Sequence, residues 1–120
     1  MTYDNNNIFA KILRKEIPCK KIYENKYALA FYDINPQAKV HIIVIPKSKY
    51  ISFADFSQNA SKDEIEGFFK VVGKVAEDKD LVKGGYRILA NHGVNAGQEV
   101  PHFHIHIFGK ESLGPMISKI

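Results

Sequence analysis

Residues 101–109 of the chain read PHFHIHIFG, in which histidines alternate with phenylalanine and isoleucine. Side chains along a β-strand point to opposite faces in turn, so this pattern predicts a strand over residues 101–108. His102, His104 and His106 would then share one face, and the apolar residues between them would fill the other. The stretch therefore predicts a sheet with one buried side and a row of three imidazoles on the opposite side.

Neighbouring imidazoles on such a face are about 6.5 to 7 Å apart. Two imidazolium charges at that distance repel by roughly 2.5 kcal/mol at an effective dielectric constant of ~20. The row therefore favours neutral imidazoles near pH 7, which can attack phosphorus, accept a proton or bind a metal ion. His-x-His on a strand is also a good partial zinc site, so this pattern alone gives metal and phosphoryl chemistry nearly equal weight.

Hydrophobic periodicity outside this stretch predicts four more strands and two helices. Residues 40–46, VHIIVIP, are almost all apolar and β-branched, which is typical of a central strand. Ser61 and Glu64 form a capping box at the start of a long helix with apolar residues at spacings of three and four. A short helix carrying Ile8, Phe9, Ile12 and Leu13 ends before Pro18, the other strands cover residues 20–24, 27–33 and 86–91, and residues 92–99 form a glycine-rich loop.

These elements indicate an α+β fold with a mainly antiparallel sheet, because the turns between neighbouring strands are short. The 120 residues suffice for a single domain, 1–120, with a core over about residues 8–109 and short tails. A chain of this size leaves part of one sheet face uncovered, which favours an oligomer that covers it.

The composition excludes several classes of protein. Hydrophobic residues make up 45% and charged residues 25%, which rules out disorder as the main state and a fibrous class. The sequence has no apolar run near the roughly 20 residues of a membrane-spanning helix, and the opening MTYDNNN does not read as a secretory signal. Since Cys19 is the only cysteine, no internal disulfide can form, and we expect a cytoplasmic protein. The net charge of +4 suits an anionic ligand, but only two of the 17 cations are arginines, so we expect neither nucleic acid nor a membrane as a partner.

Three further polar features could take part in chemistry. His41, near the start of the 40–46 strand, either reaches the histidine row or caps a loop. Asp33, where a strand gives way to a loop, could accept two hydroxyl hydrogen bonds, as from a ribose, or form an Asx turn. Asn91 and the loop at residues 93–98 offer an amide and backbone N–H groups that suit a phosphate. An apolar stripe on the first helix could wall a pocket for an aromatic base or simply be core: Ile8, Phe9 and Ile12.

Taken together, these stretches resemble the histidine triad (HIT) family. PHFHIHIFG follows the family pattern His-φ-His-φ-His-φ-φ, in which φ is apolar. Further matches occur in order as IFAKILRKEIP, ALAFYDINPQAKVHIIVIPK, GYRILAN and AGQEVPHFHIHIFG, which cover nearly all of residues 8–109. The chain is most similar to the Hint branch, which consists of small dimeric purine-nucleotide hydrolases.

The resemblance implies a five-stranded antiparallel sheet and a homodimer whose two sheets form one continuous sheet. It also implies hydrolysis of the P–N bond of purine nucleoside phosphoramidates, such as AMP joined to lysine or another amine, with AMP or GMP as the nucleotide. Hydrolysis of dinucleoside polyphosphates and purine-nucleotide binding with little turnover are the alternatives. No cofactor and no metal are implied.

The resemblance also assigns roles to residues. His104 would attack the α-phosphorus and form a nucleotidyl-histidine, which water then resolves. His41, His102 and His106 would orient His104, contact the phosphate and help to move protons, and Asp33 would hold the ribose hydroxyls. The base pocket would be lined by Ile8, Phe9, Ile12, Phe31 and Ile34, and the phosphate would be bordered by Asn91, Gly97, Gln98 and Glu99.

Three features depart from the family pattern. Some relatives carry Cys-x-x-Cys near the start and a histidine after the IPK strand, which together form a structural zinc site. Here Asn7 and Ala10 take the cysteine positions and Lys49 or Tyr50 the histidine position, so we predict no structural zinc. Glu99 stands where Ser or Thr is frequent, and because a carboxylate repels phosphate, its backbone N–H could be the donor instead. The tail KESLGPMISKI is this chain's own and could tune substrate choice.

Overall fold

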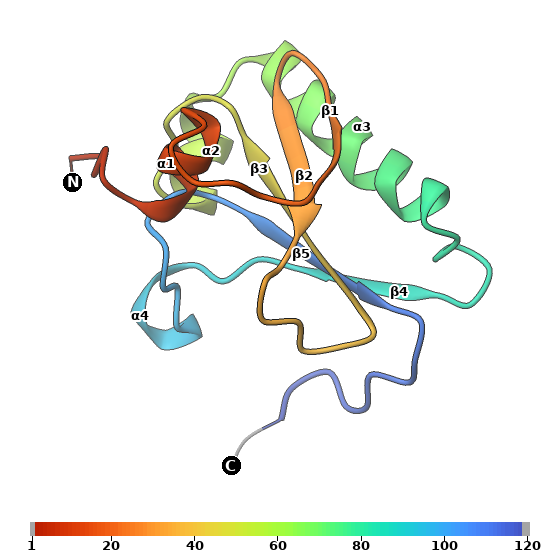
Figure 1. The fold of residues 1–120 in the computed structure, drawn as a ribbon. Coiled ribbons are helices and arrows are strands. Elements are labelled where there is room, and N and C mark those ends of the chain that lie inside the picture. The colour runs from red at the N-terminus through yellow and green to blue at the C-terminus, as the bar shows by residue number, and fades with distance from the viewer. Residues whose placement is uncertain (1, 119–120) are drawn as a thin grey trace.

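The computed structural model describes residues 2–118 and is built around a five-stranded antiparallel sheet in the order β1-β2-β3-β5-β4 (Figure 1). The strands are β1 (Lys21–Glu24), β2 (Ala28–Tyr32), β3 (Val40–Pro46), β4 (Tyr86–Leu89) and β5 (Ile105–Gly109). All four neighbouring pairs are antiparallel. The α+β fold with a five-stranded antiparallel sheet is therefore confirmed.

The middle strand is β3, which pairs with β2 on one side and β5 on the other. All of its residues after Val40 are buried, as its β-branched apolar sequence predicts. In the register with β5, His41 lies opposite Phe108 and Ile43 lies opposite His106. Since directly opposite residues share a face of the sheet, His41 and His106 are diagonal neighbours on one face.

The long helix α3 (Lys62–Asp78) covers the other face of the sheet. It begins with the predicted capping box, in which Ser61 and Glu64 each bond to the other's backbone N–H. Its buried residues Phe68, Val72 and Val75 join a core cluster that includes Ile42 and Phe103. Figure 1 shows this helix running along the sheet beside β1 and β2.

The short helix α1 (Ile8–Leu13) lies against the face that carries His41 and His106. The Asn7 side chain caps it by accepting a hydrogen bond from the Ala10 N–H, at 2.9 Å. Phe9 and Ile12 pack in a second core cluster with Leu29, Phe31, Ile43 and Ile45. Each face of the sheet thus has its own apolar cluster.

Two helices were not predicted from the sequence: α2 (Phe53–Asn59) and α4 (Gly93–Ala96). Helix α4 lies within the segment predicted as a loop, and Gly97 ends it in the left-handed conformation with φ at +72°. None of the helices within residues 2–118 has the length and apolar character needed to cross a bilayer.

The predicted strand over residues 101–108 is wrong at its start, because β5 begins only at Ile105. The His102 N–H donates to the Val100 carbonyl, at 2.9 Å, and the Phe103 N–H donates to the Tyr50 carbonyl, at 2.7 Å. These backbone groups are therefore used outside the sheet ladder. Of the three histidines in this stretch, only His106 lies on the strand.

Candidate active site

The sequence-predicted polar residues gather around a cavity of about 250 Å³. It lies between α1, the loop after β2, the connection from β4 to β5, and β5 itself. Its lining includes Phe9, Asp33, Asn91, Gly97, Gln98, Glu99, His104 and His106 from the predicted set, together with Asn35, Gln37, Ile43 and Val100. The cavity thus joins segments that are far apart in the sequence.

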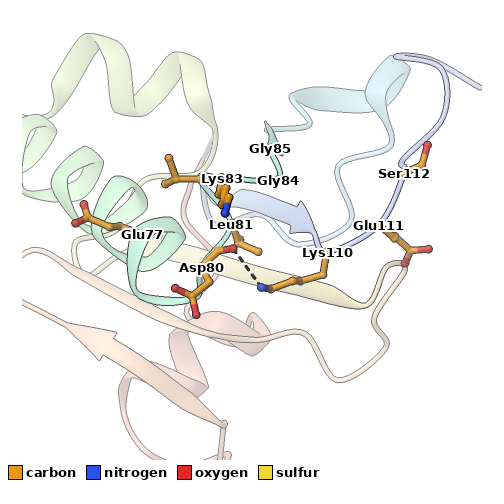
Figure 2. A pocket seen from close by; sticks show the side chains of 10 residues that line it. Glu77, Asp80, Leu81, Lys83, Gly84, Gly85, Lys110, Glu111 and Ser112 are labelled. Carbon is orange, nitrogen blue, oxygen red and sulfur yellow. Dashed lines mark hydrogen bonds between the residues drawn. The ribbon is translucent and has the colours of Figure 1, made fainter.

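A wider hollow of about 1180 Å³ lies elsewhere on the surface, between the end of α3 and the end of β5 (Figure 2). Its lining mixes acidic and basic side chains, and the Lys110 ammonium donates to the Asp80 carbonyl, at 3.2 Å. No histidine is among its lining residues. We therefore take the smaller cavity as the candidate site.

His104 lies just before β5, where it is almost fully buried and lines the cavity. Its Nδ1 is 2.7 Å from the main-chain oxygen of His102. A carbonyl oxygen only accepts, so the proton of His104 is on Nδ1 and the lone pair is on Nε2. Burial lowers the pKa of His104 below its usual value, so the ring is neutral at pH 7. The Phe9 ring packs edge-on against it, with centroids 4.9 Å apart.

His102 is fully buried and does not line the cavity. Its Nε2 lies 2.9 Å from the Pro46 carbonyl and its Nδ1 lies 2.5 Å from the Tyr3 hydroxyl. Nε2 is thus the donor, and Nδ1 accepts from Tyr3. Burial lowers the pKa of His102 to about 4. With both nitrogens occupied, this ring has no free atom for a phosphate or a proton, and of its predicted roles the geometry shows the orienting one, through the main-chain oxygen that accepts from His104.

His41 and His106 form a hydrogen-bonded pair beside the cavity. The Gln37 N–H donates to Nδ1 of His41, at 3.1 Å, so the proton of His41 is on Nε2. Nε2 of His41 lies 2.9 Å from Nδ1 of His106, which must therefore accept. The proton of His106 is left on Nε2, for which residues 2–118 provide no hydrogen-bond partner.

Burial is the main reason why this pair is neutral. It lowers the pKa of His41, although the nearby Asp33 carboxylate acts in the opposite direction. It lowers the pKa of His106 to about 4, and the charges that His104 and His41 would carry lower it further. The sequence predicted neutral imidazoles from the repulsion between their charges, whereas desolvation is the larger cause of the neutral state of His41 and His106.

Asp33, His41 and His106 each place one potential metal-ligand atom within 4.8 Å of the others. A metal ion on Nε2 of His41 would require the proton on Nδ1, where the Gln37 N–H already donates. The 2.9 Å contact between the rings of His41 and His106 is likewise explained by a single hydrogen bond, in which Nε2–H of His41 donates to Nδ1 of His106. The donors around these residues fit a hydrogen-bonded chain and do not fit a metal centre.

The Asp33 carboxylate forms the Asx turn that was one of its two predicted roles, and it also lines the cavity. Its Oδ1 accepts from the Asn35 N–H, at 2.7 Å, which is an Asx turn. Its Oδ2 lies 3.4 Å from Nε2 of His41, and the residue lines the cavity. One oxygen thus shapes the loop while the other faces the imidazoles.

The side chain of Gln98 holds the loop beside the cavity together. Its amide nitrogen donates to the carbonyls of Ile51, at 2.7 Å, and Val100, at 3.1 Å. Its amide oxygen accepts from the Gly93 N–H, at 3.1 Å. Because the amide is fully engaged, Gln98 acts on the cavity through the shape of the loop.

The predicted base-pocket residues do not all lie in one place. Phe9 lines the cavity, whereas Ile12 and Phe31 pack with it in the core cluster under α1. Ile8 and Ile34 are exposed, at 41% and 78%. Ile34 borders a separate hollow that shares Asp33 with the cavity.

Sequence reasoning missed Tyr3, Gln37 and Pro46, which fix the protons on the histidines. Tyr3 lies in the polar opening segment, outside any periodic pattern. Gln37 and Pro46 act through a main-chain N–H and a main-chain carbonyl. Every residue type except proline carries both groups, so no sequence signal could have found these two.

The fold and the cavity define a small α+β protein with a histidine site at one end of an antiparallel sheet. The family model for the HIT domain matches residues 14–113. The chain therefore belongs to the HIT family, as its sequence indicates.

Curated relatives span almost the whole chain. An uncharacterised 13.2 kDa HIT-like protein of Azospirillum brasilense is 58% identical over 118 residues, which are 98% of this chain and 97% of the relative. The purine nucleoside phosphoramidase of Escherichia coli K12 is 39% identical over 112 residues, which are 92% of each chain.

Solved structures show the same fold. A histidine triad protein from Clostridium difficile superposes with a TM-score of 0.85 at 38% identity and covers 95% of this chain and 98% of its own. A HIT family hydrolase from Legionella pneumophila superposes with a TM-score of 0.81 at 34% identity and covers 91% of this chain and 96% of its own.

Proposed function

We propose that this protein is a hydrolase that cleaves the P–N bond of purine nucleoside phosphoramidates through a nucleotide held covalently on Nε2 of His104. The observation that carries the proposal is the state of His104, a neutral ring with its proton on Nδ1 and its lone pair on Nε2 beside a polar cavity. The 39% identity to a purine nucleoside phosphoramidase supports the substrate class.

In the first step, the Nε2 lone pair attacks the α-phosphorus and the P–N bond breaks. The electron pair of that bond leaves with the nitrogen, which departs readily only when it is protonated. Burial lowers the pKa values of His41, His104 and His106, so these rings hold no extra proton in the free protein. The proton for the leaving nitrogen therefore comes from solvent through the mouth of the cavity. His104 keeps its Nδ1 proton on the His102 carbonyl, so the nucleotidyl-imidazole carries a positive charge and is a good leaving group.

In the second step, a water oxygen attacks phosphorus from the side opposite His104. The bond between phosphorus and Nε2 breaks, its electron pair returns to Nε2, and the water proton passes to solvent. The proton taken up in the first step is thus returned, and a nucleoside monophosphate leaves. Dividing one displacement into two easier ones is the benefit of the covalent intermediate.

His106 stabilises the phosphoryl group in both steps. Its Nε2–H lacks a partner among the described residues and donates to a phosphoryl oxygen, where negative charge develops. His41 keeps His106 in this tautomer by donating to its Nδ1. The backbone N–H groups of the loop that Gln98 holds supply further donors.

The same site also offers groups that would bind the ribose and the purine of the nucleotide. Asp33 faces the imidazoles with one carboxylate oxygen and accepts the ribose hydroxyls there. Phe9 and the exposed Ile8 and Ile34 provide apolar surface for the purine. Cys19 is a free thiol, which fits a reducing compartment, and we propose the cytoplasm as the location.

We also propose that the protein is a homodimer joined along β4. This strand lies at an edge of the sheet, so its outer backbone groups are available for pairing. Its residues Tyr86 and Ile88 are exposed, at 40% and 48%. Pairing of two β4 strands would extend the sheet across both protomers and cover these side chains.

Mass spectrometry of protein quenched during turnover of AMP joined to lysine tests the reaction. We expect one nucleoside monophosphate on the peptide that contains His102 to His106, and a slower or absent adduct with a diadenosine polyphosphate. An active protein with no adduct would contradict the covalent mechanism, and faster turnover of the polyphosphate would contradict the substrate class. Tight binding of AMP without turnover would favour a binding protein.

Prolonged treatment with a chelator tests the rival, metal-dependent reaction. We expect unchanged activity, because the donors around His41 leave no nitrogen free for an ion. Loss of activity that zinc restores would contradict the proposal.

A further inference from the structure

The Tyr3 side chain reaches across the chain to a histidine 99 positions away. Its hydroxyl lies 2.5 Å from Nδ1 of His102, and the two rings meet edge to face with centroids 5.6 Å apart. The ammonium of Lys49 lies 5.9 Å from the centroid of the tyrosine ring. The segment before α1 is thus anchored by its aromatic side chain.

Tyr3 and Pro46 hold His102 from both sides. The Pro46 carbonyl accepts from Nε2, and the Tyr3 hydroxyl donates to Nδ1. The main-chain oxygen of this same residue accepts the Nδ1 proton of His104. A continuous set of hydrogen bonds therefore runs from the Tyr3 hydroxyl through His102 to the ring that we propose as the nucleophile.

We propose that Tyr3 is a positioning residue for His104, whose hydroxyl holds His102 in the Nε2–H tautomer and so fixes the main-chain oxygen that keeps the His104 proton on Nδ1. This inference rests on the proposed function, because it gives Tyr3 a part in the reaction of His104. Tyr3 itself does not line the cavity.

The hydroxyl has a specific task because His102 is fully buried. Without the donor, Nδ1 would lack a partner in a site closed to solvent, which is a costly state for a buried acceptor. The ring could regain a partner only by rotating or by exchanging its proton between the nitrogens. Either change would disturb the Pro46 bond and the His102 main chain. Burial also raises the pKa of Tyr3, so the hydroxyl keeps its proton at neutral pH.

Tyr3→Phe removes the hydroxyl and keeps the ring. With AMP joined to lysine as substrate, we expect kcat to fall about tenfold and KM to stay within about twofold. Tyr50→Phe is the matched control, because its hydroxyl donates to Glu64, at 2.8 Å, and touches no histidine. We expect this control to keep its kcat. An unchanged kcat in Tyr3→Phe, or an equal loss in Tyr50→Phe, would overturn the proposal.

Nitrogen-15 spectra of histidine-labelled protein provide a readout that needs no substrate. In the wild type we expect a protonated Nε2 on His102 and a protonated Nδ1 on His104. In Tyr3→Phe we expect the Nδ1 signal of His102 to move toward that of a free acceptor and the His104 Nδ1 proton to exchange faster. Unchanged signals would overturn the proposal. If the wild type hydrolyses no phosphoramidate, the proposed function fails, while these spectra still decide the role of Tyr3.

Discussion

Nε2 of His41 donates a hydrogen bond to Nδ1 of His106 across two neighbouring strands, at 2.9 Å. The antiparallel register of β3 and β5 makes these residues diagonal neighbours on one face. Because the Gln37 N–H occupies the other nitrogen of His41, the direction of the bond is fixed. The pair therefore presents an N–H to the cavity, whereas His104 presents a lone pair.

This arrangement predicts the tautomer of each ring. At pH 7 we expect two-dimensional proton–nitrogen spectra to show His41 and His106 protonated on Nε2 and His104 protonated on Nδ1, all neutral because burial lowers each pKa. Addition of AMP should shift the Nε2–H signal of His106 more than that of His41. A doubly protonated His106 in the free protein at pH 7 would contradict the hydrogen-bonded chain.

Replacement of the proposed nucleophile separates chemistry from binding. We expect His104→Ala to lower kcat at least about 10³-fold, because no other ring offers a lone pair to the cavity. AMP affinity, measured by calorimetry, should change less than about tenfold. His92→Ala is the control, since this exposed histidine lies outside the cavity lining. Turnover by His104→Ala at the wild-type rate would contradict the assignment.

The buried histidines predict loss of stability in acid. The pKa of His102 is about 4 in the folded protein against the usual 6.5, so below pH 6.5 the unfolded chain binds a proton that the folded chain does not. The contribution of His102 to stability is therefore complete above pH 6.5 and is lost as the pH drops toward 4. At about 1.4 kcal/mol per pH unit, His102 alone would cost about 3 kcal/mol.

Urea unfolding at pH 7.5 and pH 4.5 measures this loss. We expect His102→Gln to be less stable at pH 7.5 and to show a smaller difference between the two pH values. His92→Gln should keep the wild-type difference. A wild-type stability that does not change between these pH values would contradict the neutral buried state of His102.

The loop beside the cavity predicts an effect of Gln98. Gln98→Ala removes three hydrogen bonds that join this loop to Ile51, Gly93 and Val100, each of which contributes roughly 1 kcal/mol. We expect a KM several-fold higher, because the loop backbone no longer holds its place beside the phosphate. Gln58→Ala, an exposed glutamine on α2, should leave KM unchanged. An equal KM in both variants would show that the loop keeps its shape without the amide.

The apolar edge strand predicts the oligomeric state. Light scattering should give twice the 13.6 kDa of the single chain. We expect Ile88→Glu to yield monomers, because two carboxylates would meet in the interface. Val94→Glu, a change at a valine on α4 that is 95% exposed against 48% for Ile88, should stay dimeric. A dimeric Ile88→Glu protein would move the interface away from β4.

Local signals predicted the elements that depend on a few adjacent residues. The capping box at Ser61 and the β-branched run of β3 each depend on residues that are adjacent or nearly adjacent in the sequence. Both elements therefore begin where the sequence indicates. Helix α2 was missed because it buries only Phe56 and therefore shows no apolar periodicity. The strand near His102 was extended too far because alternation is the same for extended chain inside and outside a sheet. The Val100 carbonyl, which takes the His102 N–H, and the distant Tyr50 carbonyl, which takes the Phe103 N–H, decide between them.

The difference between local sequence signals and contacts with distant parts of the chain also applies to the candidate site. Four of the polar side chains that the sequence singled out line the cavity, namely Asp33, Asn91, His104 and His106, and each is visible in the sequence as a residue type. The sequence could not predict which histidine faces inward, since His102 and His104 follow the same alternation. That difference depends on Tyr3 and on the Pro46 carbonyl, which the fold brings to His102 from distant parts of the chain.

Strand β3 connects both ends of the histidine cluster. His41 lies near its beginning, and the carbonyl that receives the His102 proton belongs to Pro46 at its end. Insertion or deletion of one residue between them would turn all later side chains to the opposite face and displace that carbonyl. The number of residues between His41 and Pro46 therefore fixes the relative positions of the two ends of the site. Changes in chain length are compatible with this arrangement only in the loops that flank the strand.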